Sequence, residues 1–467
     1  MSWDRVWRAP QSCTARSSLT RLCARSSPLV VAPFTDTVYA LVVNKSLIDA
    51  RRARVGVFGF FFLAGFVMGL WAAGLPSLYD RLELDTARLG SVLLLISGGA
   101  LVSMLLAGPL VDRFSSRRIC WFAGPFSGLV LLGPALAPSY WSLAALAVLF
   151  GLGLGVTEVA MNAHSVEVER RYGRPIISAF HGTWSLGGAA GGGLTSIVLQ
   201  AGLDAQWLLI VAALVVPFLY LPAARLLLPD PPEHTSGEPG AEPGSSLKWG
   251  LIALLGLAAF AGHLSEGAAI DWAALHARLV LAADPALAPL AYTIFSVAMT
   301  TVRLLGDPIR ARFGSVRTIQ LAGIFATAGY VLVLLSPAVA QPLRVACAWT
   351  GWALAGVGLA TVVPVLFSAV GAAGGRVGRA LAMVTAFGYS GLLLGPAVLG
   401  YVAEASSLPI ALIIPTVLAA VVTLTGSPAI RALLRLSRDP APAPSAEPAG
   451  VGGSGGEHGH APEPARD

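Results

Sequence analysis

Apolar segments long enough to cross a lipid bilayer recur along most of this chain, from Val55 to about Gly426. A helix needs about 20 residues to cross the roughly 30 Å hydrocarbon core of a bilayer. A chain that repeats such segments is expected to cross a membrane many times. We expect about twelve spans, at residues 55–76, 87–111, 119–137, 141–165, 177–202, 206–228, 248–275, 286–309, 318–337, 342–370, 380–403 and 407–426.

The composition supports helices in a membrane. Hydrophobic residues make up 55% of the chain and charged residues only 12%, whereas about a quarter of the residues in soluble proteins are charged. The apolar runs are continuous and rich in Gly and Ala, as closely packed helices require, while a transmembrane β-barrel would show short alternating segments. The sequence therefore predicts an all-α membrane protein. The four cysteines show no paired spacing, so no disulfide, metal site or other cofactor is expected.

The basic residues are almost all arginine, and their distribution indicates topology rather than binding to nucleic acid. If the N-terminus lies inside, the inner loops carry most of the arginines and the outer loops carry few. This asymmetry follows the positive-inside rule, and an even number of spans returns the C-terminus to the same side. We therefore expect a plasma membrane protein (the inner membrane of a bacterium) with both termini in the cytoplasm. The outer loops hold only Arg81, Arg88, Arg278 and Arg344.

A polar stretch from Pro229 to Ser246 divides the spans into six and six, as expected for two joined membrane repeats. Residues before about Lys45 lack a convincing signal peptide. They fit a disordered basic leader, an organelle-type presequence or a start codon assigned too far upstream. The tail is rich in Pro, Ala, Gly and Ser, which predicts disorder. The expected organisation is a leader at 1–54, a six-helix bundle at 55–228, a cytoplasmic linker at 229–247, a second bundle at 248–426 and a disordered tail at 427–467.

Glu158 and Asn162 are polar residues within an otherwise apolar span. Burying a charged side chain at the centre of a membrane helix costs roughly 2.5 kcal/mol or more, so such residues usually face a bundle interior or a water-filled path. Their four-residue spacing places acid and amide on one helix face, where both can meet one ligand. The alternative is a structural role, in which a neutral carboxyl bonds a neighbouring helix.

Two short turns in corresponding places of the two halves echo each other. One runs from Gly108 to Arg118 and the other from Gly306 to Arg317, and both begin with glycine and carry charges. The first resembles the signature loop of the major facilitator superfamily, G-x-x-x-D-R-x-G-R-R, except that Ser115 replaces a glycine that would tolerate positive φ more easily. The resemblance implies two pseudo-symmetric six-helix bundles, alternating access and a gating role for Gly108, Asp112, Arg113, Arg117, Arg118, Asp307 and Arg312.

Other stretches resemble the fucose-permease-like branch of this superfamily. Glu158 and Asn162 occupy the E-x-A-x-N positions whose acid is implicated in proton coupling in that branch. The resemblance implies a proton-coupled carrier for a small, sugar-like solute, for which a monomer suffices. The matching stretches are residues 71–76, 158–162, 180–188, 266–272 and 388–396.

Several further residues are candidates for the substrate site. Glu266 and Asp271 lie in or near the seventh span and could complete a polar pocket, or they could be solvated where that helix ends. His181 could relay protons or bond a neighbouring loop. Aromatic side chains could stack on a sugar or could belong to the interfacial belts of the membrane. These aromatic residues are Trp71, Trp184, Trp272 and Tyr389.

Other functions remain possible to different degrees. Efflux of drugs or metabolites by proton antiport fits the same fold. The antiporter run G-x-x-x-G-P-x-x-G-G is absent from the fifth span, and a similar run lies on the eleventh, from Gly391 to Gly400. A membrane enzyme would normally show a sizeable soluble domain, and a channel would show filter residues or rings of like charge. Neither pattern is present, so we expect a carrier and not an enzyme.

Overall fold

The structure is a computed structural model that describes residues 32–174, 176–229, 249–341, 343–371 and 377–436. Within these ranges the backbone is almost entirely helical and contains no strand, which confirms the all-α prediction. The side chains of residues 32–47, 307, 371, 377–379, 381–382 and 436 are not described either. The predicted linker therefore falls almost wholly outside the described residues.

The first half of the chain forms seven helices, two of which make up a single membrane crossing. Local sequence signals fix their ends: Ser139 caps α5 through a reciprocal bond pair with Ser142, and Gly173 ends it in the left-handed conformation. The helices are α1 (Ala32–Arg81), α2 (Thr86–Phe114), α3 (Ser116–Leu129), α4 (Leu132–Leu136), α5 (Tyr140–Tyr172), α6 (Ile177–Gln200) and α7 (Ala205–Arg225).

The second half repeats this arrangement with more interruptions. Its helices are α8 (Trp249–Leu279), α9 (Pro289–Leu304), α10 (Gly306–Leu335), the 3-10 turn η1 (Ser336–Ala338), α11 (Leu343–Leu359), α12 (Val362–Gly371), α13 (Val377–Ala405), α14 (Leu408–Ala411), α15 (Ile413–Val421), the π turn η2 (Val422–Gly426) and α16 (Ser427–Leu436).

Ten helical segments within the described residues are long and apolar enough to cross a membrane. Two further helices pack among them: α6, which is rich in glycine, and α9, which has only 16 residues. Ten segments and these two helices make the twelve crossings that the sequence predicted.

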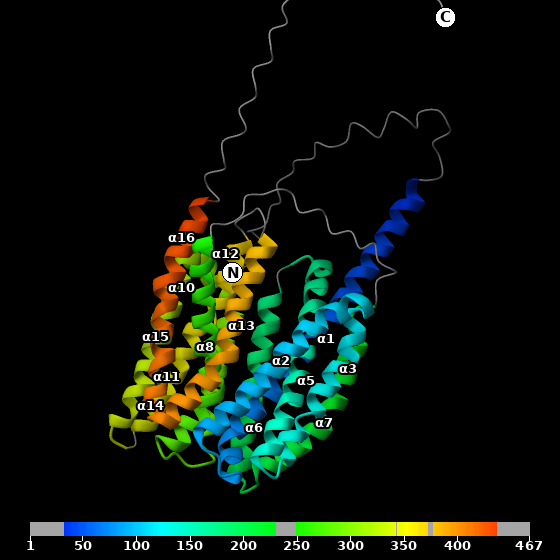
Figure 1. Ribbon diagram of the computed structural model, residues 1–467. Coiled ribbons are helices and arrows are strands. Elements are labelled where there is room, and N and C mark those ends of the chain that lie inside the picture. The colour runs from blue at the N-terminus through cyan, green and yellow to red at the C-terminus, as the bar shows by residue number, and fades with distance from the viewer. Residues whose placement is uncertain (1–31, 175, 230–248, 342, 372–376, 437–467) are drawn as a thin grey trace, which may run out of the picture.

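The two halves pack side by side, as Figure 1 shows with the first half in blue to green and the second in green to red. Within the halves, α1 packs on α6 and α2 on α5, while α8 packs on α13 and α10 on α11. Between the halves, α2 packs on α13 and α6 on α9. We call the end where α7 stops and α8 starts the linker end, and the end where α1 stops and α2 starts the far end. In Figure 1 the two halves lie closest at the far end, at the bottom of the view.

Glycine permits the close packing of α1 on α6. A Cβ atom at Gly65 would lie 1.9 Å from the backbone oxygen of Trp184, and one at Gly187 would lie 2.0 Å from that of Phe62. Atoms cannot approach so closely, so only glycine fits at these crossings. The Gly-rich composition that pointed to packed helices thus has a direct structural cause.

Two predicted boundaries are wrong within the described residues. The first helix begins at Ala32, so residues 32–54 are helical rather than disordered, and α16 makes residues 427–436 helical as well. Both extensions bury apolar side chains: Ala50 and Ala53 are fully buried in α1, as are Ala429 and Ile430 in α16. Residues 1–31 and 437–467 lie outside the described part of the chain.

Candidate functional site

Glu158 and Asn162 lie on one face of α5, as their spacing predicted, and they contact each other. The side-chain amide of Asn162 donates to Oε1 of Glu158 at 2.9 Å and to the backbone oxygen of Glu158 at 2.8 Å. Both side chains are half-buried. The amide therefore holds the carboxyl group in one orientation.

Arg303, near the end of α9, joins this region to the other half of the molecule. Its Nη1 donates to Oγ of Ser185 on α6 at 2.8 Å, and its Nη2 donates to Oε1 of Glu266 on α8 at 2.8 Å. The side chains of Arg303 and Glu266 are only 10% and 13% exposed. The charge of Arg303 also acts on Glu158. A guanidinium of the second half therefore pairs with Glu266 and bonds Ser185 of the first half, and its charge acts on Glu158.

Further polar and aromatic side chains surround these three charged groups. The charges of Arg303 and Glu266 both act on His181 on α6, and the ring of His181 packs against that of Phe61. Tyr389 on α13 lies within the field of Glu158, and its ring centroid is 5.8 Å from that of His263 on α8. Tyr292 on α9 lies within the field of Glu266 and Arg303. We call Glu158, Asn162, His181, Ser185, Glu266 and Arg303 the central cluster.

Three residues that the sequence put forward for the site lie elsewhere or at its edge. Trp71 is 1% exposed and packs on Phe150, whose ring centroid is 5.4 Å away, so it belongs to the core of the first half. Trp184 is half-buried, and its backbone packs against Gly65. Trp272 is fully buried, which excludes an interfacial position in this conformation.

Asp271 is buried rather than solvated. The sequence left open that α8 ends near Trp272, but the helix continues to Leu279 and leaves Asp271 only 8% exposed. Its charge acts on Tyr292, as does that of Glu266. The solvated alternative is therefore wrong for Asp271. No described hydrogen bond joins it to the central cluster.

The signature turn lies at the linker end and is mostly helix. Gly108 and Asp112 belong to the last turns of α2, and only Ser115, with φ of 77°, interrupts the helix before α3. The equivalent position of the second half is Gly314, with φ of 73°. The expected need for positive φ at Ser115 is confirmed.

Most of the charged side chains that are described in these turns are exposed in this conformation. Asp112, Arg113, Arg118 and Arg312 are exposed, and Arg117 is half-buried. The guanidinium of Arg113 lies 5.2 Å from the ring of Phe114, and Arg312 repeats this contact 5.9 Å from Phe313. The side chain of Asp307 is not described. Asp112 forms no ion pair with any residue whose side chain is described, so its gating role stays a prediction.

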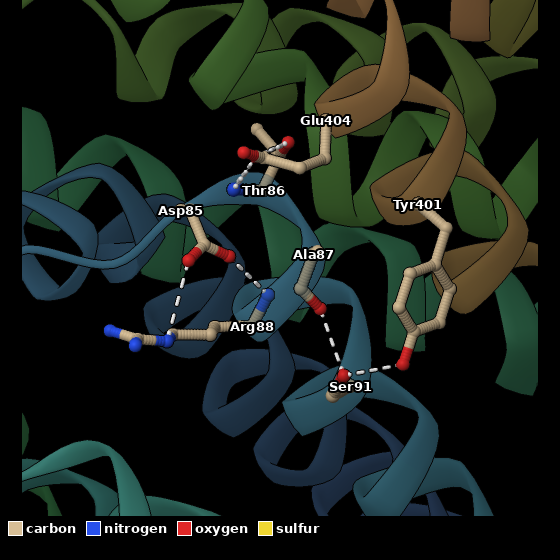
Figure 2. A network of polar contacts seen from close by, with 7 residues as sticks. All are labelled: Asp85, Thr86, Ala87, Arg88, Ser91, Tyr401 and Glu404. Atoms are coloured by element: carbon tan, nitrogen blue, oxygen red, sulfur yellow. Dashed lines mark hydrogen bonds and ion pairs between the residues drawn. The ribbon is translucent and has the colours of Figure 1, made fainter.

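Polar contacts also tie the two halves together at the far end. Glu404 on α13 accepts hydrogen bonds from the backbone nitrogen and Oγ1 of Thr86, at 3.1 and 2.8 Å, and the hydroxyls of Ser91 and Tyr401 are 2.9 Å apart (Figure 2). An ion pair between Asp80 and Arg278 spans 3.1 Å. We call these contacts the far-end seam. The carboxylate of Glu404 satisfies a free N–H at the start of α2, where a negative charge is favoured.

Sequence reasoning missed Arg303 and Ser185. Arg303 lies within the predicted eighth span, so the rule that drew attention to Glu158, a charge inside an apolar segment, could also have found it. Ser185 carried no comparable signal, because serine hydroxyls often bond their own helix backbone. In the described part of the chain, no group of three or more His, Cys, Asp or Glu side chains could hold a metal ion.

Several relatives of this chain are named as transporters. An uncharacterised transporter of Sinorhizobium fredii is 35% identical over 379 residues, which cover 79% of this chain and 96% of the relative. An uncharacterised MFS-type transporter of Yersinia pestis is 33% identical over 352 residues, covering 75% of this chain and 89% of the relative. A D-xylose transporter of Levilactobacillus brevis is 22% identical over 188 residues, covering 39% of this chain and 41% of the relative.

Solved structures share the fold at low sequence identity. A D-xylose–proton symporter aligns with a TM-score of 0.65 and 16% identity, covering 81% of this chain and 97% of that one. The nucleoside transporter NupG aligns with a TM-score of 0.58 and 15% identity, covering 82% of this chain and 99% of that one. The family model described as Major Facilitator Superfamily matches residues 57–373. The chain therefore belongs to the major facilitator superfamily of membrane transporters.

Proposed function

We propose that this transporter moves a small, neutral, sugar-like solute together with a proton by alternating access. The observation that carries the proposal is the central cluster, in which the carboxyl of Glu158 lies 2.9 Å from the amide of Asn162 and within the field of Arg303 from the other half. A carboxyl group at the interface of two rocking halves can bind a proton on one side of the membrane and release it on the other.

The chemistry of the central cluster favours a neutral, hydroxyl-bearing solute. The amide of Asn162, the hydroxyl of Ser185 and the guanidinium of Arg303 can each hydrogen-bond a hydroxyl group. Two carboxyl groups against one guanidinium disfavour an anion. Tyr389 adds an aromatic face on which the apolar side of a sugar ring can stack. Glu266 and Asn162 would contact the solute, whereas Trp71 is set apart from it by burial.

The arginine distribution assigns the linker end to the cytoplasm, with both termini there. On this assignment the far-end seam closes the transporter to the outside, and the signature turns with Asp112 and Arg312 face the cytoplasm. The conformation is then closed outside, which is one of the two states that alternating access requires. We further propose that the protein acts as a monomer in a bacterial inner membrane.

The experiment that tests this proposal measures the internal pH of proteoliposomes containing the purified protein. A panel of sugars, nucleosides and small metabolites is added outside, and acidification of the lumen reports proton symport. We expect acidification with one class of neutral polar solute. Alkalinisation on addition of a drug or metabolite would instead indicate antiport, and an unchanged pH across the whole panel would contradict proton coupling to such solutes.

A further inference from the structure

An apolar groove runs along the second half, between α10 and the segment that α15 and η2 form. Its volume is about 420 Å³, within the range of about 300–1,000 Å³ for ligand pockets. Two of its lining side chains, Ile324 and Leu424, are 54% and 70% exposed, and exposed apolar side chains on membrane-spanning helices contact lipid tails. In Figure 1 these helices lie along the outer edge of the second half. The groove therefore opens towards the bilayer.

The two threonines that line the groove have their hydroxyl hydrogen bonds within the protein. Oγ1 of Thr327 donates to the backbone oxygen of Gly323 at 2.7 Å, and Oγ1 of Thr423 donates to that of Gln320 at 3.2 Å. Threonine hydroxyls commonly bond helix backbone in this way. The other lining residues are apolar: Ile324, Ala328, Val331, Ala420 and Leu424. The groove therefore suits an apolar occupant such as an acyl chain.

Three exposed arginines lie at the linker end of the same helices. Arg317 precedes Ile324 by seven residues, or about two helical turns, so it lies on the groove face of α10. Arg431 and Arg435 lie one turn apart on α16, which begins directly after η2 and packs on α10. In the described part of the chain no acidic side chain pairs with any of the three. Their charges are therefore available to an anion.

The packing of α10 against η2 places the arginines beside the end of the groove. A Cβ atom at Gly426 would lie 3.0 Å from Cγ1 of Ile319, so these two residues are at the same level. Arg317 is two residues beyond Ile319 and Arg431 is five beyond Gly426, which is about 3 and about 8 Å along the helix axes at about 1.5 Å per residue. Both arginines lie just outside the membrane spans expected from the sequence. They are therefore placed at the membrane surface.

A second apolar groove shows what sets the first one apart. It has a volume of about 470 Å³ and is lined by side chains of α8, α13 and α15. Among the described side chains of these three helices the only arginine is Arg278, and it pairs with Asp80 at the far end. The two grooves are alike in size and apolar lining. The unpaired arginines at one end are what distinguish the first.

We propose that the first groove and its three arginines form a binding site for an anionic phospholipid in the leaflet at the linker end. The lipid phosphate bonds the guanidiniums of Arg317, Arg431 and Arg435, and one acyl chain lies in the groove. Guanidinium groups form paired hydrogen bonds with phosphate oxygens, and basic residues at a membrane surface attract anionic lipids. The bound lipid joins α10 to α16. This inference involves neither solute nor proton, so it is independent of the proposed function.

The arginines are tested by native mass spectrometry of the purified protein titrated with phosphatidylglycerol. Phosphatidylcholine with the same acyl chains, which also carries a phosphate but no net charge, is the control lipid. We expect the first phosphatidylglycerol to bind more tightly than phosphatidylcholine. Arg317→Gln, Arg431→Gln and Arg435→Gln should each weaken its binding about fivefold. Arg225→Gln, which removes an exposed arginine at the linker end of the first half, is the matched control and should leave binding unchanged.

The groove is tested by filling it. Ala328→Phe places a ring in the groove at an exposed position, so the protein should fold while the acyl chain loses its place. Val398→Phe puts the same side chain into the second groove, again at an exposed position. The first variant should weaken binding of phosphatidylglycerol severalfold and the second should not.

Three results would overturn the proposal. One is equal binding of the two lipids to the unaltered protein, and another is a phosphatidylglycerol preference that survives removal of all three arginines. The third is displacement of phosphatidylglycerol by inorganic phosphate alone, which would assign the arginines to a soluble anion. Equal effects of Ala328→Phe and Val398→Phe would likewise rule out the first groove as the place of the acyl chain.

Discussion

The central cluster and the far-end seam both join the two halves through charged side chains, but they differ in burial. Arg303 and Glu266 are 10% and 13% exposed, whereas Arg278 and Asp80 are 35% and 46% exposed. An exposed ion pair contributes about 0–1 kcal/mol. Removing one partner of a buried pair costs roughly 3–5 kcal/mol, because it leaves an uncompensated charge.

This difference matches what each region must do in a carrier. On the proposed mechanism the far-end seam opens and closes in every cycle, and contacts that water can replace break at little cost. On the proposed mechanism the central cluster holds a proton and distinguishes charge states, which requires a site where water does not screen the charges. We therefore expect substitutions at the centre to change coupling and substitutions at the far end to change only the balance of conformations.

The largest effect is expected at Glu158. Glu158→Gln removes the proton-binding group but keeps the hydrogen bond from Asn162, so solute exchange should persist while accumulation driven by a pH gradient falls to background. Parallel uptake and exchange assays in proteoliposomes measure both. If this variant still accumulates solute at the wild-type level in a pH gradient, proton coupling does not depend on the central cluster, and the proposed difference from the far-end seam is wrong.

A structural effect is expected at the linker end, where the two halves have different residues at equivalent positions of positive φ. Ser115 and Gly314 both have positive φ, at 77° and 73°, a conformation that suits glycine. Ser115→Gly should raise the stability of the protein by about 1 kcal/mol, and Gly314→Ser should lower it by a similar amount. Thermal unfolding in detergent measures both. Stability changes of the same sign in the two variants would show that backbone strain does not distinguish this turn in one half from its counterpart in the other.

A smaller effect is expected at Glu404. Glu404→Gln removes the negative charge beside the start of α2, a contribution of about 0.3–1 kcal/mol. The fraction of molecules closed at the far end should fall by up to about fivefold relative to the open fraction. Spin labels at Arg88→Cys on α2 and at Ser406→Cys, directly after the end of α13, report this fraction as a distance distribution. Loss of proton coupling in this variant would contradict the assignment of coupling to the centre.

The smallest effect is expected at the pair of Asp80 and Arg278. Because both side chains are substantially exposed, Asp80→Asn should shift the same distance distribution by less than about twofold at moderate salt. High salt should reduce even this difference, since mobile ions screen exposed charges. A shift larger than that of Glu404→Gln would show that burial does not rank these contacts.

The sequence predicted the fold well because bilayer-length apolar segments admit few structures. Glu158 and Asn162 could be found for a related reason, since a charge inside such a segment is conspicuous. The burial of Trp71 could not be predicted, because an aromatic residue in a span can face a core or a site, and apolar periodicity does not separate the two. The contact between Arg303 and Ser185 could not be predicted, because it joins residues 118 positions apart through the packing of α6 on α9.

The measurement that tests the account most directly is the steady-state accumulation of the transported solute against an imposed pH difference, with the membrane voltage held at zero. One proton per cycle at Glu158 predicts that the accumulation ratio rises about tenfold for each unit of pH difference. It also predicts no rise in Glu158→Gln. Accumulation that ignores the gradient in the wild type, or that follows it equally in the variant, would contradict a proton carried by Glu158.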